Sequence, residues 1–243
     1  MSRKTKLLVT GANGTIGTRF CHAMQEHYEL RMADQQTHAL AGIQGERVPL
    51  DITDLSACRR ACDGVDAVLH LAGIPLPDAP FEPLVAVNIV GTYHMLQAAY
   101  ESGVSRFVFA SSAQVNEGYP SDVQTEERQP VRPGNLYGVS KCSGEAMGAY
   151  FAYQHNLSNV AVRIANYLPE LTLLNCTTHR DRAAYLSPRD ANQLLRLCID
   201  TPSIQFLIVN GVSNNRYKRL DLTTARERLN YQPKDDAFAI LDL

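Results

Sequence analysis

The sequence predicts an α/β fold in which a doubly wound parallel sheet is covered by helices on both faces. Short apolar runs of strand length alternate along the chain with stretches of helical periodicity, a rhythm typical of βαβ units. A glycine-rich turn joins the first apolar run to the first helical stretch. The chain has 243 residues, 45% of them hydrophobic, enough for one sizeable core but short for two ordinary domains. We therefore expect a single domain over residues 1–243.

Five apolar runs are predicted to be buried strands: Lys6–Thr10, Glu29–Ala33, Ala67–Leu71, Arg106–Ala110 and Val160–Ile164. The gaps between them predict helices at Thr15–His27, Asp54–Cys62, Phe81–Ser102 and Leu136–Gln154. The rhythm loosens over Asn166–Leu186 and resumes with a helix near Pro188–Asp200, a strand near Ile204–Asn210 and a short helix near Asp221–Leu229. Because parallel strands bind ligands beyond their carboxyl ends, functional residues are expected after each strand. Residues 166–243 are predicted to form a small substrate cap.

Composition points to a small-molecule partner. The 23 basic and 25 acidic residues are spread along the chain, without the charge block of a nucleic-acid or membrane tail. No apolar run has the length of a signal sequence or a membrane span, so a cytoplasmic location is expected. The six cysteines are scattered without a CxxC pair, which predicts free thiols and no metal. Cys58 and Cys62 share a helix face, but no histidine stands beside them.

The first apolar run leads into Thr10–Gly17, a G-x-x-G-x-x-G turn that opens a helix. Glycines let the backbone approach a pyrophosphate, and the helix N-terminus attracts the anion. Asp34 follows the second strand about twenty residues on, where a carboxylate accepts bonds from the adenosine ribose and repels a 2′-phosphate. This combination predicts a Rossmann-type site for NAD, with the loop contacts Gly11, Asn13, Gly14, Thr15, Ile16 and Gly17. Asp34 could instead cap a turn, and nearby Arg31 leaves NADP open.

Two later strand ends are further candidates for cofactor contact. Leu50-Asp51-Ile52 is predicted to end the third strand, where such folds hold the adenine, although Asp51 could also lead into a helix cap at Asp54. The small residues of Leu71-Ala72-Gly73 would let the backbone of the fourth strand pass close to the cofactor. His70, just before them, is interpreted as a packed strand residue.

The catalytic candidates follow the fifth strand. Ser112 ends that strand, and Tyr137 and Lys141 follow on the next helix at i,i+4 spacing, which places them on one helix face. The ammonium is expected to favour the ionised phenol and so to lower the pKa of Tyr137, which could then act as general base. Ser112 would hold the substrate oxygen. Taken singly, Tyr137 could be a surface aromatic, Lys141 a solvated charge and Ser112 a turn residue. Their order along a chain that also contains a dinucleotide loop favours catalysis.

Through these motifs the chain resembles the short-chain dehydrogenase/reductase superfamily. Asn88, in Asn88-Ile89-Val90-Gly91-Thr92, matches the helix asparagine of its extended epimerase/dehydratase branch. More narrowly, Phe109–Ser112, Leu136–Cys142, Val162–Ile164 and Gln232–Asp235 are similar to phrases of the uronate dehydrogenases. That resemblance implies NAD-dependent oxidation of the anomeric carbon of a hexuronic acid to an aldarolactone. It also implies cofactor contacts at Asn88 and Ile164, and a carboxylate-binding arginine whose register falls on Arg180.

The substrate residues depart from the pattern of that family. The resemblance implies substrate contacts at Pro75, Ser111, Ser112, Ala113, Gln114, Asn166 and Arg180. Pro75 stands where a serine is usual, Ala113-Gln114 replaces Asn-His, and Asn166 replaces a small hydroxyl residue. The segment Asn166–Ala183 is also longer by several residues. Arg182 or Arg189 could bind the substrate carboxylate in place of Arg180. Arg180 could equally be a solvated loop arginine without a substrate contact.

We therefore expect an NAD-dependent dehydrogenase that oxidises a sugar acid or a related polyhydroxy substrate. A nucleotide-sugar epimerase or dehydratase is the enzymatic alternative, although the larger C-terminal nucleotide pocket of those enzymes is not evident. A non-catalytic dinucleotide sensor is the other alternative, and the intact Ser112, Tyr137 and Lys141 argue against it. By resemblance, the helices Phe81–Ser102 and Leu136–Gln154 would form a homo-oligomer interface.

Overall fold

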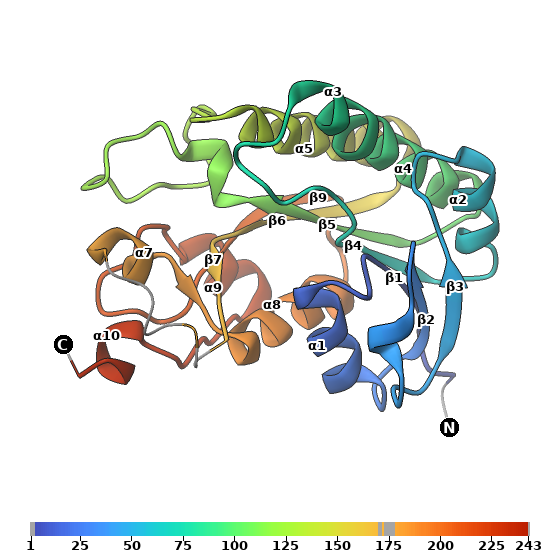
Figure 1. The fold of residues 1–243 in the computed structure, drawn as a ribbon, viewed down its shortest axis with the longest axis horizontal. Helices are drawn as coiled ribbons and strands as arrows, with labels where there is room; N and C mark the ends of the chain where they lie inside the picture. Colours follow the sequence, from blue (N-terminus) through green and yellow to red (C-terminus); the bar gives the residue numbers. More distant parts are fainter. Residues whose placement is uncertain (1–2, 170–171, 173–177, 243) are drawn as a thin grey trace.

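The computed structural model describes residues 3–169, 172 and 178–242. In this part of the chain, seven strands pair in parallel in the order β3-β2-β1-β4-β5-β6-β9 (Figure 1). Their bounds are β1 (Lys6–Thr10), β2 (Glu29–Asp34), β3 (Glu46–Pro49), β4 (Ala67–His70), β5 (Arg106–Ser112), β6 (Ser158–Ile164) and β9 (Phe206–Gly211). The strand order reverses direction between β1 and β4, the usual position of a ligand crevice in such sheets. The predicted Rossmann-type doubly wound fold is confirmed.

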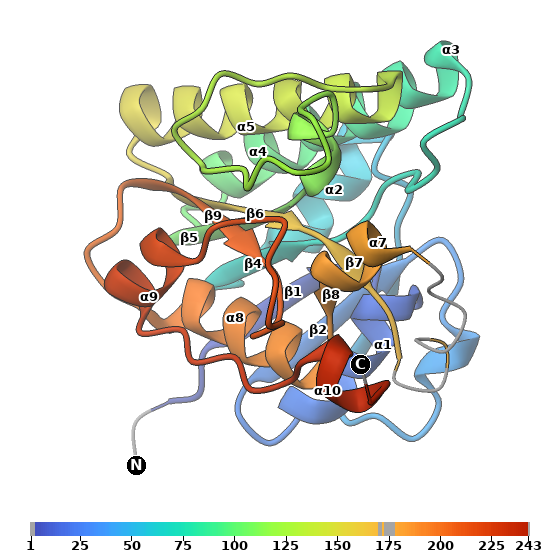
Figure 2. The same ribbon diagram turned by 90° about the vertical axis from the view of Figure 1, so that its left-hand side faces the viewer.

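Helices cover both faces of the sheet (Figures 1 and 2). One layer contains α2 (Leu55–Cys62), α4 (Thr92–Glu101) and α5 (Leu136–His155), and the other contains α1 (Thr15–Met24), α8 (Pro188–Asp200) and α9 (Thr223–Leu229). Each layer packs its own apolar cluster against the sheet. The central strands β1, β4, β5 and β6 are buried on both faces, which is why they appear in the sequence as continuous apolar runs. The edge strand β3 is largely exposed.

The predicted helix Phe81–Ser102 is interrupted. It consists of α3 (Phe81–Leu84), a π-helical stretch at Val85–Gly91 and α4. Such wide turns are rare and often occur at functional sites, and this one contains Asn88. The prediction that Leu50–Ile52 ends the third strand was wrong, because β3 stops at Pro49. Beyond the strand, the Leu50 amide still donates to the Asp34 carbonyl of β2 (2.9 Å).

The segment after β6 has more regular structure than the sequence indicated. Two short strands, β7 (Asn166–Tyr167) and β8 (Tyr185–Leu186), pair in parallel, and α7 (His179–Ala183) lies between them along the chain. The last helix, α10 (Ala237–Ile240), lies near α7 (Figure 2). Residues 170–171 and 173–177, which belong to the predicted cap and include Cys176, lie outside the described residues. The assignment of 166–243 as a substrate cap stays a prediction.

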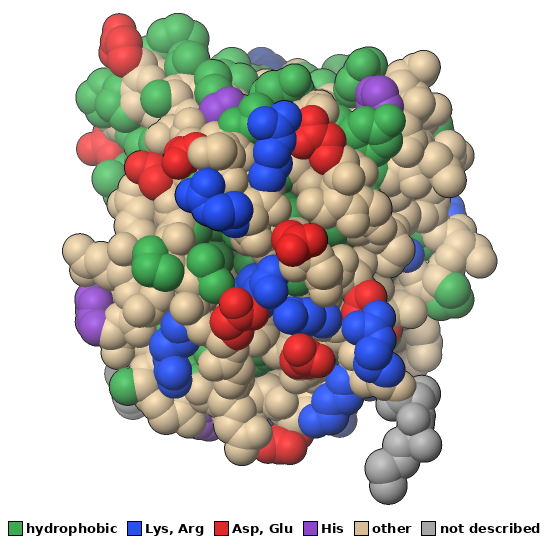
Figure 3. Space-filling view, turned by 90° about the vertical axis from the view of Figure 1, so that its right-hand side faces the viewer, with side chains coloured by type: hydrophobic (Ala, Val, Ile, Leu, Met, Phe, Trp, Pro, Cys, Tyr) green, Lys and Arg blue, Asp and Glu red, His purple; other side chains and the backbone are tan. Residues whose placement is uncertain are grey.

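The surface is mixed in character. Basic and acidic side chains are interspersed on the face shown in Figure 3. Within the described ranges, no helix is both long and apolar enough to cross a bilayer, and no group of His, Cys, Asp and Glu could hold a metal ion. The helices α4 and α5 expose the aromatic residues Tyr93, Tyr100, Tyr150 and Tyr153. A homo-oligomer built through these helices stays a prediction.

Candidate active site

A cleft of about 860 Å³ opens at the carboxyl ends of β1, β2, β4, β5 and β6. It contains most of the residues predicted from the sequence: Gly11, Gly14, Thr15, Ile16, Gly17, Asp34, Asp51, Ile52, Leu71, Ala72, Gly73, Pro75, Ser111, Ser112, Ala113, Gln114, Tyr137, Lys141, Ile164, Asn166 and Arg180. Asn13 and Asn88 do not line it. The cleft spans the position between β1 and β4 where the strand order reverses, so the fold alone explains why these distant segments meet.

The glycine loop has the shape that a dinucleotide requires. Gly11 has φ of +68°, and a Cβ atom there would lie 2.6 Å from the Ala72 backbone nitrogen. A Cβ at Gly17 would collide with the Gly11 carbonyl. Gly14 precedes α1 and has no side chain to cap the helix, so the first N–H groups of α1 face the cleft without a side-chain acceptor. This cradle fits the pyrophosphate of NAD.

Asp34 ends β2 and lines the cleft beside this loop. Its carboxylate accepts a hydrogen bond from the Asn13 amide (2.9 Å), and the Asn13 side chain accepts one from the Ala39 amide (2.8 Å). Asn13 therefore shapes the loop from outside the cleft, and one Asp34 oxygen is bonded to that loop. The contact of Asp34 with the adenosine ribose stays a prediction. Arg31 does not serve a 2′-phosphate here, because its guanidinium bonds Glu46 (2.7 Å) and two backbone carbonyls.

The helix-cap interpretation of the loop after β3 is confirmed at Asp54, and the adenine contact at Asp51 stays a prediction. Asp54 caps α2 by accepting from the amides of Ser56 (2.8 Å) and Ala57 (3.1 Å). Asp51 lines the cleft, and its carboxylate accepts from the amide and hydroxyl of Thr53, bonds that lower the pKa of Asp51. Asp51 is therefore an ionised group in the wall of the cleft.

Asn88 lies behind the β4 loop. Its side chain accepts from the Ile74 amide (2.8 Å) and donates to the Ile74 carbonyl (3.0 Å) and to the Ser140 hydroxyl (3.0 Å). The residue is 2% exposed. Its described contacts join the β4 loop to α5, so any effect on the cofactor would act through the backbone around Gly73.

His70 is a packed strand residue, as predicted. It is fully buried between Thr10 (2.7 Å) and Thr92 (3.3 Å). Burial lowers the pKa of His70 to about 3, so the ring is neutral at physiological pH.

Ser112, Tyr137 and Lys141 meet in one wall of the cleft. The two α5 residues lie on the same helix face, and the Lys141 Nζ is 5.6 Å from the centre of the Tyr137 ring. The Nζ donates to the Ala110 carbonyl (2.8 Å), and burial lowers the pKa of Lys141 to about 8. The predicted lowering of the Tyr137 pKa was wrong for this structure: burial raises it, and a bond with the Ser112 side chain opposes that rise. Tyr137 is only 8% exposed, and the effect of its desolvation is larger than that of the bond with Ser112.

The hydroxyl of Ser112 is positioned by the turn that follows it. Its Oγ accepts from the Gln114 amide (3.2 Å), and the Gln114 side chain accepts from the Asn135 amide group (2.7 Å). Asn135 caps α5 through the Gly138 amide (2.8 Å), so the turn and the start of α5 are linked. The neighbouring Ser111 donates its hydroxyl to buried Glu145 (2.6 Å), so this group is already bonded within the protein.

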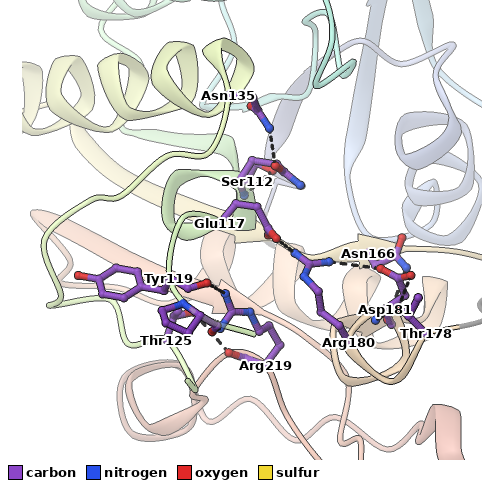
Figure 4. A network of polar contacts seen from close by, with 12 residues as sticks. Ser112, Glu117, Tyr119, Thr125, Asn135, Asn166, Thr178, Arg180, Asp181 and Arg219 are labelled. Atoms are coloured by element: carbon purple, nitrogen blue, oxygen red, sulfur yellow. Dashed lines mark hydrogen bonds and ion pairs between the residues drawn. The ribbon is translucent and has the colours of Figure 1, made fainter. Parts of the chain in front are cut away.

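Arg180 lies at the far end of the cleft, on α7. Its guanidinium forms an ion pair with Glu117 and another with Asp181 (3.2 Å) (Figure 4). Glu117 lines the cleft five residues after Ser112 and was missed by sequence reasoning, although a carboxylate so close to a catalytic strand end was an available signal. Arg182 is absent from the described lining, and Arg189 bonds Asp235 (3.1 Å) elsewhere.

The chain matches the model of the NAD dependent epimerase/dehydratase family over residues 7–183. It is 34% identical over 260 residues to the NAD-dependent glucose-6-phosphate dehydrogenase of Haloferax volcanii, covering 95% of this chain and 94% of that protein. It is 33% identical over 234 residues to the uronate dehydrogenase of Pseudomonas syringae (96% and 82%). It is 31% identical over 261 residues to the L-arabinose 1-dehydrogenase (NAD(P)(+)) of Haloferax volcanii (98% and 99%).

Solved structures give the same assignment. The uronate dehydrogenase of Agrobacterium tumefaciens, in a mutant form complexed with NAD, superposes with a TM-score of 0.90 at 32% identity, covering 98% of this chain and 88% of that one. The resemblance to the extended short-chain branch, and within it to uronate dehydrogenases, is therefore confirmed. The chain belongs to the NAD dependent epimerase/dehydratase family and is an NAD-dependent dehydrogenase of that family.

Proposed function

We propose that this protein oxidises a hydroxyl group of a sugar acid or a related polyhydroxy compound. The observation that carries the proposal is the convergence of Ser112, Tyr137 and Lys141 in the wall of the cleft that contains the glycine loop. The same cleft has room for a small polar substrate beside the dinucleotide. Relatives that act on glucose 6-phosphate, uronate and L-arabinose support a sugar substrate.

The chain's own residues divide the work of oxidation. Ser112 accepts a bond from Gln114, which holds its oxygen in place. When substrate binds, the Ser112 hydroxyl donates to the substrate oxygen in place of the Tyr137 oxygen. The Tyr137 oxygen takes the hydroxyl proton as the carbon–oxygen double bond forms. NAD, when bound, supplies the hydride acceptor. Lys141 lies behind the Tyr137 ring, where its ammonium offsets the cost of a buried phenolate.

Replacement of Tyr137 by phenylalanine tests this assignment. Turnover, followed by NADH absorbance with panels of uronic acids, neutral sugars and hydroxy acids, should fall by about a hundredfold or more, as loss of a positioned base usually causes. NAD affinity by calorimetry should stay nearly unchanged, because the ring keeps its bulk. Tyr153→Phe is the matched control, since Tyr153 is exposed on the same helix. A Tyr137→Phe enzyme that retains most of its rate would contradict the assignment of the base.

NADH accumulation also separates the alternatives. An epimerase or dehydratase would rearrange its substrate without net release of NADH, and a dinucleotide sensor would bind NAD without turnover. Steady production of NADH with any member of the panel therefore favours the dehydrogenase.

A further inference from the structure

The terminal nitrogens of Arg180 both have carboxylate partners within the protein. Nη2 pairs with Glu117 and Nη1 with Asp181 (3.2 Å). Among the described residues that line the cleft, Arg180 is the only arginine, whereas Glu117 and Asp181 both line it. Recognition of a carboxylate by arginine uses these same donor atoms in a two-pronged geometry. A sugar carboxylate at Arg180 would therefore compete with two carboxylates that already hold its terminal nitrogens, and it would be repelled by both.

Glu117 is held at this position by the chain on both sides. It directly follows the 3-10 turn Ala113–Asn116, which starts from Ser112. The next residue, Gly118, donates its amide to the Arg132 carbonyl (2.7 Å), and a Cβ at this glycine would contact the same carbonyl. The Tyr119 carbonyl accepts from the Arg219 guanidinium (3.0 Å). Hydrogen bonds to two other parts of the chain therefore hold the segment that contains Glu117 in place.

The pair is also partly shielded from water. The side chains of Arg180 and Glu117 are 31% and 24% exposed, so their interaction is less screened than that of an ordinary surface pair. Arg219, the other guanidinium nearby, is 5% exposed and donates to backbone carbonyls of Tyr119 and Pro120. It does not line the cleft, so it offers no alternative donor to a substrate carboxylate.

We propose that Glu117 and Arg180 together bind hydroxyl groups of the sugar and that Glu117 excludes anionic substrates. The inference rests on the proposed dehydrogenase function. Of the two substrate classes proposed above, it selects uncharged polyhydroxy sugars over sugar acids. A hydroxyl group can donate a hydrogen bond to a carboxylate and accept one from a guanidinium. Neighbouring sugar hydroxyls can therefore bond Glu117 and Arg180 while the ion pair stays intact. A substrate carboxylate at the same place would face the negative charges of Glu117 and Asp181, and the one nearby cation, Arg180, is already paired with both.

Matched sugars isolate the charge at this end of the substrate. Glucose and glucuronate, and likewise galactose and galacturonate, differ only by a hydroxymethyl group in place of a carboxylate. For wild type, Glu117→Gln and the control Glu126→Gln, kcat/KM would be measured with NAD, and sugar binding to the NADH-saturated enzyme by calorimetry. Glu126 is exposed and lies outside the described lining of the cleft, so its variant removes an equal charge nearby.

Wild type should prefer each neutral sugar by about tenfold or more, the scale of one charge-assisted bond lost or opposed. Glu117→Gln keeps the shape of the side chain but removes the charge that pairs with Nη2 of Arg180. The variant should therefore shift the preference toward the acid by a similar factor. Glu126→Gln should leave the ratio at its wild-type value.

The outcomes separate this inference from the proposed function. Oxidation that favours the uronate, or a ratio that Glu117→Gln leaves unchanged, would overturn the role of Glu117 while the dehydrogenase stands. Sugar binding with the expected ratio but no NADH formation would overturn the proposed dehydrogenase function and support the role of Glu117 and Arg180 in sugar binding. If no sugar binds and none is oxidised, both fail.

Discussion

Replacement of Lys141 by methionine tests the energetic cost of the buried ammonium. Lys141 is 6% exposed, and burial lowers its pKa from 10.5 to about 8. Because the folded value lies below the unfolded value, the unfolded chain binds this proton more tightly. The lysine therefore destabilises the fold fully below about pH 8, and the cost disappears as the pH rises to about 10.5.

The structure sets the size of the effect. The interval between 10.5 and about 8, at about 1.4 kcal/mol per pH unit, corresponds to about 3 kcal/mol. Methionine has similar length but loses the bond to the Ala110 carbonyl, which offsets about 1 kcal/mol. Lys141→Met should therefore exceed the wild type by about 2 kcal/mol in unfolding free energy near neutral pH. Near pH 10.5 the variant should be equal or slightly weaker.

Urea unfolding without NAD, followed by circular dichroism at both pH values, measures this difference. Lys234→Met serves as the control, since Lys234 is exposed, and its effect should not depend on pH in this way. Turnover by Lys141→Met should be largely lost, so stability and activity would change in opposite directions. A variant that is less stable at neutral pH, or one whose gain is equal at both pH values, would refute the reasoning.

Two further predictions concern the cofactor end of the cleft. Asp34→Ala should raise NADP affinity relative to NAD by about tenfold in calorimetry, because it removes the carboxylate that would face the 2′-phosphate; an unchanged ratio would remove Asp34 from the ribose site. Asn88→Leu should cost about 2–4 kcal/mol in urea unfolding and weaken NAD binding, since both backbone groups of Ile74 lose their partners. A variant as stable as wild type would contradict that role.

The sequence by itself determined the features whose physics is local. Apolar runs marked the strands because a parallel sheet covered on both faces leaves no polar side. The helix Pro188–Asp200 has the predicted bounds because Ser187 caps it and a proline occupies its first turn. The glycine loop, and the i,i+4 spacing that puts Tyr137 and Lys141 on one helix face, are likewise set by neighbouring residues.

Only the tertiary structure decided the features that depend on packing between distant segments. The pKa of Tyr137 rises because the fold buries it, and the spacing to Lys141 carries no information about desolvation. Asn88, in the π-helical stretch, bonds the backbone of Ile74 and does not line the cleft, and these contacts depend on how two distant segments pack. Arg180 meets Glu117 because α7 and the β5 turn border the same cleft. Burial and ion pairing follow from distances in space, which the order of residues along the chain does not specify.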